Sequence, residues 1–147
     1  MDEIIDYWGR KRSRDLYRDG VITYKAPNKH FGDAFLKLEK TLGIETQKVR
    51  RKKDAEIFCE FGDPANKNWT GVYHASTSKR GKPQGHIVVR PNKSYSQSTV
   101  IHEIGHALGL NHPGDHSRTD TIMSYGAPDD LPWFTKLDRS ALVSLYA

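Results

Sequence analysis

Residues 102–112 read His102-Glu103-Ile104-Gly105-His106-Ala107-Leu108-Gly109-Leu110-Asn111-His112. Side chains four residues apart lie nearly above one another on a helix, so His102 and His106 can present their imidazoles to one metal ion. Glu103 is offset by one residue, so it misses the metal but reaches a water molecule bound to it. Gly109 can adopt the left-handed conformation that ends a helix and reverses the chain. That turn brings His112 round as a third ligand.

This ligand set predicts a catalytic zinc site. Three protein ligands leave zinc one open position, as in catalytic rather than structural sites. Zinc lowers the pKa of a bound water to about 7, which supplies hydroxide at neutral pH. We expect Glu103 to act as the general base during attack on a peptide carbonyl and to pass the proton to the leaving nitrogen. A bare HExxH pattern also arises by chance, but the added glycine and third histidine make chance assembly roughly a one-in-10^4 event.

The same stretch resembles the extended zinc signature of the metzincins, HExxHxxGxxH. That family also has a methionine turn beneath the metal, and residues 121–125, TIMSY, are similar to it. The resemblance implies that Met123 forms a hydrophobic floor under the three histidines and does not bind the metal. Tyr125 is similar to the tyrosine that serralysins and astacins place near zinc. This likeness implies a fifth ligand at rest and a hydrogen-bond donor to the tetrahedral intermediate.

The resemblance is specific to motifs over residues 86–146. Within the family, residues 111–115, 123–125 and 137–146 are closest to serralysins, whereas the compact length is similar to the catalytic domain of matrixins. By this resemblance, strand 71–76 is the free edge that pairs with an extended substrate. Residues after the methionine turn would wall the pocket for the side chain that follows the scissile bond. The implied substrate-binding residues are Gly71, Val72, Tyr73, His74, Gly126, Ala127 and Pro128.

Other candidate metal ligands form no complete set. His74 and His86 are present, but they do not complete the structural zinc site of a matrixin. Asp115, His116 and Asp120 closely follow the third histidine. We predict that they are loop residues, with contact to a cation such as Ca2+ as the alternative.

Hydrophobic patterning predicts an α+β domain. The expected strands are 21–25, 45–50, 55–61, 71–76 and 86–90, and the expected helices are 31–42, 95–108 and 136–146. The second helix would be anchored in the core by Ile101, Ile104 and Leu108, and Ser94 with Gln97 could form its capping box. This order predicts a metzincin-like (zincin) domain over residues 21–147, with a twisted mixed sheet of about five strands and three helices, preceded by an N-terminal arm at 1–20.

Composition restricts the class of protein and the compartment in which it can act. The chain has 147 residues, 36% of them hydrophobic, which fits one domain with a real core. Its apolar runs are too short to span a bilayer. Cys59 is the single cysteine, so no intrachain disulfide can form. We interpret it as a buried, inert thiol, with a latency-keeping metal ligand as the alternative. Residues 1–20 contain no secretory signal, so the chain either acts where it is made or is the processed or truncated form of a secreted protein.

The net charge of +5 is concentrated in residues 10–14 and 48–53. We interpret these runs as solvated faces rather than nucleic-acid patches, with an acidic substrate or partner as the alternative. The sequence as a whole predicts a monomeric zinc endopeptidase that cuts internal peptide bonds of extended protein substrates. The rivals are a zinc amidase or exopeptidase, and a catalytically silent, zinc-stabilised domain that binds protein or nucleic acid.

Overall fold

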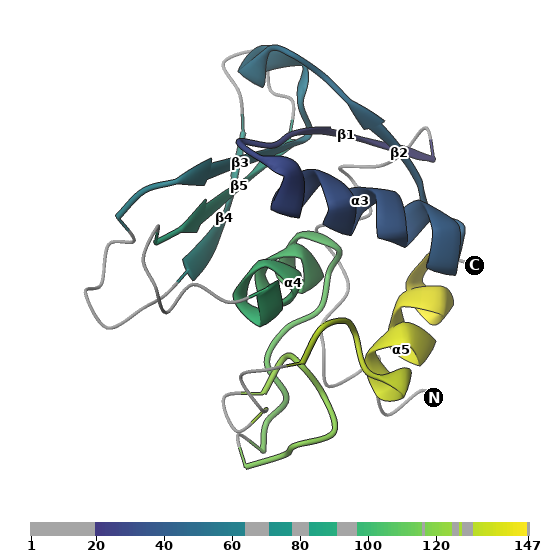
Figure 1. Cartoon of the computed structure of the whole chain (residues 1–147). Coiled ribbons are helices and arrows are strands. Elements are labelled where there is room, and N and C mark those ends of the chain that lie inside the picture. The colour runs from purple at the N-terminus through teal and green to yellow at the C-terminus, as the bar shows by residue number, and fades with distance from the viewer. Residues whose placement is uncertain are drawn as a thin grey trace.

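The computed structural model describes residues 20–63, 71–77, 83–90, 97–115, 117–124, 127 and 131–146. Within these residues, one five-stranded sheet is accompanied by three α-helices (Figure 1). The strands are β1 (Val21–Lys25), β2 (Glu45–Lys48), β3 (Ile57–Phe61), β4 (Gly71–Thr77) and β5 (Pro83–Val89). The α-helices are α3 (Lys29–Leu42), α4 (Gln97–Ala107) and α5 (Lys136–Tyr146), and a short 3-10 helix, η1, covers Lys52–Asp54. The predicted α+β class is confirmed, whereas residues 1–19 of the expected arm lie outside the described residues.

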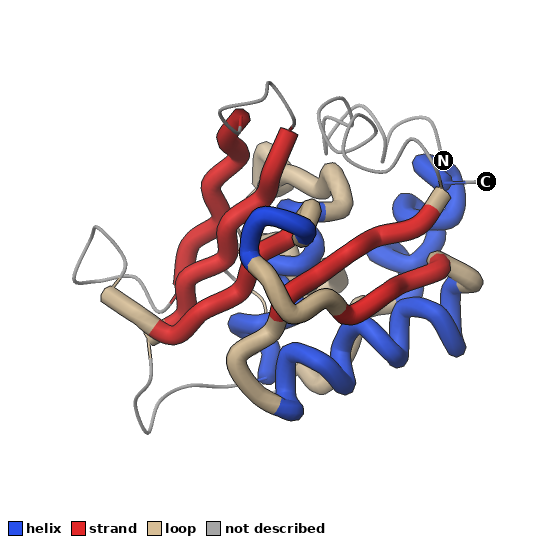
Figure 2. Tube along the Cα trace, turned by 90° about the horizontal axis from the view of Figure 1, so that it is seen from above, coloured by secondary structure: helices blue, strands red, loops and turns tan. Residues whose placement is uncertain are grey.

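The sheet is mixed, with the strand order β2-β1-β3-β5-β4. β1 runs parallel to β2 and to β3, and β3 runs parallel to β5. β4 pairs with β5 in the antiparallel direction and forms one edge of the sheet. Seen from above, the strand direction rotates between β4 and β2, which is the predicted twist (Figure 2). The strand predicted to be a free edge therefore lies at an edge.

Helix α3 covers the inner face of β1 and β3. Phe35 stacks on Tyr24 of β1 with ring centroids 4.1 Å apart, and Phe31 meets Phe61 edge-on. The helix begins where the Asn28 side chain accepts a hydrogen bond from the Phe31 N–H. It ends at Gly43, whose φ of 68° belongs to the left-handed region that favours glycine.

Helix α4 packs against the inner face of the sheet beside β4. The three residues predicted to anchor it are completely or almost completely buried: Ile101, Ile104 and Leu108. Gly71, the first residue of β4, lies so close to α4 that a Cβ there would come within 2.9 Å of the Thr99 methyl carbon and 3.3 Å of the Glu103 Cγ. The start of the edge strand therefore lies next to the helix that carries the zinc motif.

Two features of the sheet refine the sequence predictions. β5 begins at Pro83 rather than at His86, because Gln84 and Gly85 join the antiparallel ladder with β4 and proline is tolerated at the first position of a strand. Cys59 in β3 is 1% exposed, and burial raises the pKa of its thiol. The interpretation of Cys59 as a buried core residue is confirmed, and its raised pKa agrees with the predicted inert thiol.

Two further predictions concern the cap of α4 and the membrane. Ser94, predicted to cap α4, lies outside the described residues. Among the helices of the described residues, none is long and apolar enough to cross a membrane.

Candidate metal centre

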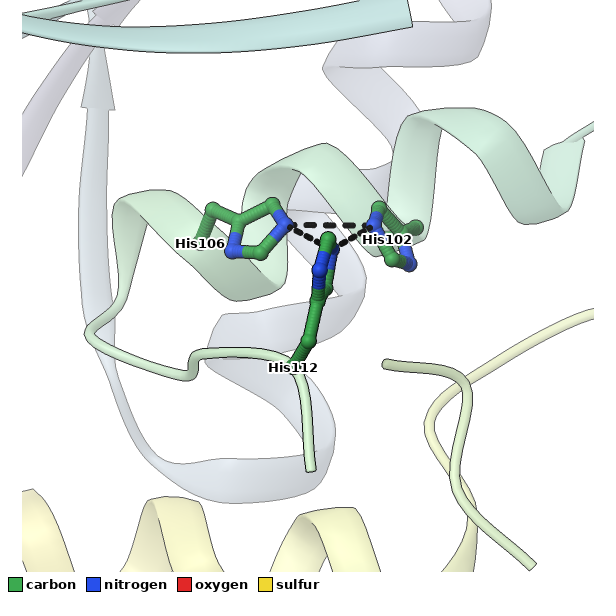
Figure 3. A group of neighbouring side chains, drawn as sticks. All are labelled: His102, His106 and His112. Carbon is green, nitrogen blue, oxygen red and sulfur yellow. Dashed lines mark hydrogen bonds between the residues drawn. The ribbon is translucent and has the colours of Figure 1, made fainter. Parts of the chain in front are cut away.

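Three histidines converge at one point beside α4. His102 and His106 project from one side of α4, and His112 reaches them from the loop that follows the helix (Figure 3). Their Nε2 atoms lie 3.1 Å apart for His102 and His106, 3.0 Å for His106 and His112, and 3.3 Å for His112 and His102. The ring planes are inclined to one another rather than stacked. The three residues that the sequence assigned to the metal are thus brought together.

The Nδ1 atoms of two of these rings form hydrogen bonds with backbone carbonyls. His102 Nδ1 lies 2.8 Å from the Ile122 carbonyl oxygen, and His106 Nδ1 lies 2.8 Å from that of Leu110. A carbonyl only accepts hydrogen bonds, so each Nδ1 must carry the proton and donate it. In a neutral imidazole this leaves Nε2 with a lone pair, and both lone pairs point into the space between the rings.

This donor set fits a zinc ion. Two nitrogens bound at 2.0–2.1 Å to a tetrahedral zinc are about 3.3–3.4 Å apart, close to the observed separations. Without a cation the converging lone pairs would repel one another, and protonation of several rings would place like charges in contact. Burial lowers the pKa of His102, and burial together with the other two histidines lowers the pKa of His106 to about 3. The site therefore favours neutral imidazoles, the form that binds metal.

The turn after α4 positions His112 and also helps to orient His106. Gly109 has a φ of 109°, and its N–H donates to the His106 carbonyl while the Leu110 N–H donates to the Gly105 carbonyl. This pair of hydrogen bonds is a Schellman motif, which requires the left-handed glycine. The same turn places the Leu110 carbonyl against His106 Nδ1. One glycine thus ends the helix and helps to orient a ligand.

Met123 is buried directly against α4. It is fully buried, and a Cβ on Gly105 would lie 2.5 Å from its sulfur, so the thioether occupies the space that a side chain at position 105 would need. Gly105 lies between the two helical histidines in sequence. This contact agrees with the apolar floor expected of Met123, whose role in the site stays a prediction.

Glu103 is 4% exposed and lies on the side of α4 that faces β4. Burial raises the pKa of its carboxyl group to about 8. A divalent cation nearby would oppose this shift by favouring the carboxylate. Within the described residues, the group of side chains able to hold a metal consists of the three histidines without Glu103. Its exclusion from the ligand group is compatible with the predicted role as a base.

The predicted substrate-binding residues are only partly covered by the structure. Residues 71–74 form the start of edge strand β4, and Gly71 adjoins Glu103. The Ala127 N–H donates to the Ser124 carbonyl in the turn after Met123. Tyr125, Gly126 and Pro128 lie outside the described residues, so their roles stay predictions.

Three of the remaining candidate ligands, His86, Asp115 and Asp120, make side-chain contacts elsewhere. His86 Nε2 lies 2.7 Å from a carboxylate oxygen of Glu60, and its ring stacks on Phe58. Asp115 accepts hydrogen bonds from Ser117, and Asp120 is paired with Arg118. His116 lies outside the described residues. The histidine cluster is thus a candidate for zinc, whereas no described contact supports calcium.

Comparison with known proteins gives short, specific similarities. No protein-family model matches the chain. Serralysin C of Dickeya chrysanthemi is 58% identical over 31 residues, which is 21% of this chain and 6% of that protein. Serralysin A of the same organism is 52% identical over 24% of this chain and 10% of its own length. Serralysin of Proteus mirabilis is 50% identical over 32 residues, which is 22% of this chain and 6% of that protein.

These matches confirm the expected resemblance to serralysins, which are metzincin metalloproteases. The aligned part of the chain spans a tenth or less of the length of each relative. The likeness to matrixins has no such support and stays a prediction.

Sequence reasoning missed the groups that hold the ligands in place. The carbonyls of Leu110 and Ile122 orient two histidines, but backbone groups leave no mark in a sequence motif. The spacing Thr135-x-x-Asp138 was a visible sign of a helix cap, but not of the contacts that Asp138 makes with residues 121 and 122.

Proposed function

We propose that this chain is a zinc-dependent endopeptidase domain that hydrolyses internal peptide bonds of extended protein segments. The observation that carries this proposal is the convergence of three imidazole Nε2 atoms within 3.0–3.3 Å, next to a buried glutamate. The partial similarity to serralysins supports the same chemistry. Three protein ligands also leave an open coordination position, which a purely structural zinc does not need.

His102, His106 and His112 would hold the ion, and the bound zinc supplies a polarised carbonyl and a water of lowered pKa. Glu103 would accept the proton of the attacking water on its carboxylate and return it to the leaving nitrogen. Its burial beside Gly71 shields the side chain from bulk water. Met123 would support the ligands from below by packing on Gly105.

Strand β4 would bind the substrate. It forms one edge of the sheet, and an extended peptide can add to such an edge through main-chain hydrogen bonds. Because the start of β4 adjoins Glu103, a peptide on this edge would pass close to the proposed base. This arrangement favours cleavage within a chain over removal of a terminal residue. The proposal also includes two roles after the methionine turn. Tyr125 would donate a hydrogen bond to the substrate oxygen, and residues 126–128 would form the wall of the pocket.

The test is digestion of unfolded casein and a mixed peptide library by the purified protein, with bound zinc counted. Glu103→Gln removes the base but keeps the shape of the side chain, so we expect the rate to fall by about 10²–10⁴-fold while zinc stays at one per chain. Glu60→Gln is the matched control, because Glu60 pairs with His86 on another part of the sheet. We expect it to cut at the wild-type rate.

The cleavage products separate the rival functions. Internal cuts support an endopeptidase, whereas release of single terminal residues or of small amides would identify an exopeptidase or amidase. Zinc-loaded wild type that cuts no more than Glu103→Gln would contradict the proposal. That outcome would favour the silent zinc-stabilised binding domain.

A further inference from the structure

Asp138 is a completely buried carboxylate that the proposed chemistry does not use. It lies in the first turn of α5 and is 0% exposed. Burying a charge is costly unless hydrogen bonds replace the lost water. Its oxygens accept from four donors: the hydroxyl of Thr121, the Ile122 N–H, the Thr135 N–H and the hydroxyl of Thr135.

One of these contacts, together with a hydrogen bond that Asp138 donates, forms a helix cap. The Thr135 N–H donates to Asp138 at 3.1 Å, and the Asp138 N–H donates to the Thr135 hydroxyl at 3.2 Å. This reciprocal pair is a capping box at the start of α5. Capping explains an acidic residue at this position, but it does not explain the two contacts with residues 121 and 122, which lie 17 and 16 positions earlier.

The contact with Ile122 connects Asp138 to the metal site through hydrogen bonds. The Ile122 N–H donates to Asp138 at 2.9 Å, and the carbonyl of the same residue accepts from His102 Nδ1 at 2.8 Å. Two hydrogen bonds thus join the buried carboxylate to the ring of a ligand. The Thr121 hydroxyl donates to Asp138 and accepts from the Met123 N–H at 3.1 Å. The same carboxylate therefore fixes the backbone on both sides of the carbonyl that orients His102.

We propose that Asp138 is a positioning residue that sets the zinc affinity of the site, acting on His102 through the backbone of Ile122. The proposal rests on the zinc site of the proposed function. Groups that hold the second nitrogen of a ligating histidine fix its tautomer and orientation, and their loss typically weakens metal binding by about 10–100-fold. Linkage requires the reverse effect as well, so bound zinc strengthens the attachment of α5 to residues 121–123.

The first test measures zinc affinity by competition with a chromophoric chelator. In Asp138→Asn the shape is kept, but the charge is lost and an NH2 group replaces one acceptor. We expect the Kd for zinc to rise about 10-fold or more, and the visible spectrum of the Co2+-loaded protein to change. Asp120→Asn is the matched control. It removes the charge of a carboxylate next to Thr121 in the sequence, and this carboxylate pairs with Arg118 rather than with Ile122. We expect the control to keep the wild-type Kd and spectrum.

The second test uses amide hydrogen exchange with and without zinc. In the wild type, zinc should slow exchange of the Ile122 N–H, whereas in Asp138→Asn this amide should exchange quickly in both forms. If Asp138→Asn does not fold, Thr121→Val decides the question, since it removes one donor to the carboxylate and leaves the charge in place. We expect a smaller rise of the zinc Kd in the same direction.

The outcomes separate this inference from the proposed function. A folded Asp138→Asn variant with the wild-type zinc Kd and Co2+ spectrum would reduce Asp138 to a helix cap and overturn the inference alone. If only Thr121→Val folds, an unchanged Kd has the same meaning. A wild-type chain that binds no zinc would overturn the metal site and the inference together. Zinc binding without peptidase activity would leave the inference standing and contradict only the proposed function.

Discussion

Two groups of side chains in the described residues differ in kind: the cluster of His102, His106 and His112, and the pair of His86 and Glu60. In the first group, His102 and His106 each direct Nδ1 at a backbone carbonyl, and their Nε2 atoms meet that of His112. In the second group, His86 directs Nε2 at the Glu60 carboxylate 2.7 Å away and stacks its ring on Phe58.

The difference shows what makes histidines a metal site. His86 has its own acceptor within the protein, so the pair needs no cation. In the first group, His102 and His106 donate their N–H groups to carbonyls, so their Nε2 lone pairs face one another, and a cation or added protons can satisfy them. The partners of the ring nitrogens therefore distinguish the two groups.

Removal of one histidine from each group should give the largest difference, which we expect in the zinc content. We expect His106→Ala to lose stoichiometric zinc, because two remaining ligands cannot complete the site. His86→Ala should retain one zinc per chain. Zinc content of both variants, measured after dialysis against zinc-free buffer, checks this prediction. Equal zinc in the two variants would contradict the distinction between the groups.

Removal of zinc by a chelator should produce the next largest effect, a loss of thermal stability. A ligand that binds only the folded state, present at about 1,000 times its Kd, adds about 4 kcal/mol to the stability. For a domain near 150 residues, each kcal/mol shifts Tm by about 2–4 °C. We therefore expect a strong chelator to lower Tm by on the order of 10 °C in the wild type and in His86→Ala. A similar drop in His106→Ala would show that the chelator acts at some other place.

Glycine substitutions compare the helix of the metal site with the helix that covers β1. In Gly105→Ala the new Cβ would lie 2.5 Å from the Met123 sulfur, whereas the same change at Gly32 of α3 meets no atom within 4 Å. Overpacking costs about 1–3 kcal/mol, and the gain in helix propensity from alanine offsets about 1 kcal/mol. We expect Gly105→Ala to be destabilised by about 0–2 kcal/mol and Gly32→Ala to be stabilised by about 0.5–1 kcal/mol. Urea unfolding of both variants measures the difference, and a stabilised Gly105→Ala would argue against the close packing of Met123.

The Glu60–His86 pair should give the smallest effect. Its side chains are 43% and 30% exposed, and ion pairs of this kind contribute about 0–1 kcal/mol. We expect Glu60→Gln to change the free energy of unfolding by less than about 1 kcal/mol and to leave the zinc Kd unchanged. Chemical denaturation and zinc titration of the variant are the measurements. A weaker zinc Kd would mean that the two histidine groups are coupled.

Local patterns in the sequence predicted much of the fold and the ligand set. The apolar stripe of residues 31–42 and the glycine at position 43 are typical of a helix and its end, and both features act within a few residues. The spacing of His102, His106 and Gly109 predicted the ligands for the same reason, since a helix and its terminal turn fix these positions with little help from the rest of the chain.

Contacts between distant segments could not be predicted in this way. The direction of β4 relative to β5 and the approach of Gly71 to Glu103 depend on how the whole sheet is assembled. The link from Asp138 to His102 passes through the backbone of Ile122, where any residue type could serve. The start of β5 was placed three residues too late, because Pro83 and Gly85 usually indicate a turn and here they are held by pairing with β4.

The central claim is that His102, His106 and His112 together bind one zinc and leave a position open. X-ray absorption spectroscopy of the zinc-loaded wild type, at one zinc per chain, tests it most directly. We predict three imidazole nitrogens at about 2.0–2.1 Å with one further light oxygen ligand, and no sulfur scatterer. A shell containing sulfur at about 2.3 Å, or four imidazoles, would contradict the account, because the first implicates Cys59 and the second closes the position that catalysis requires.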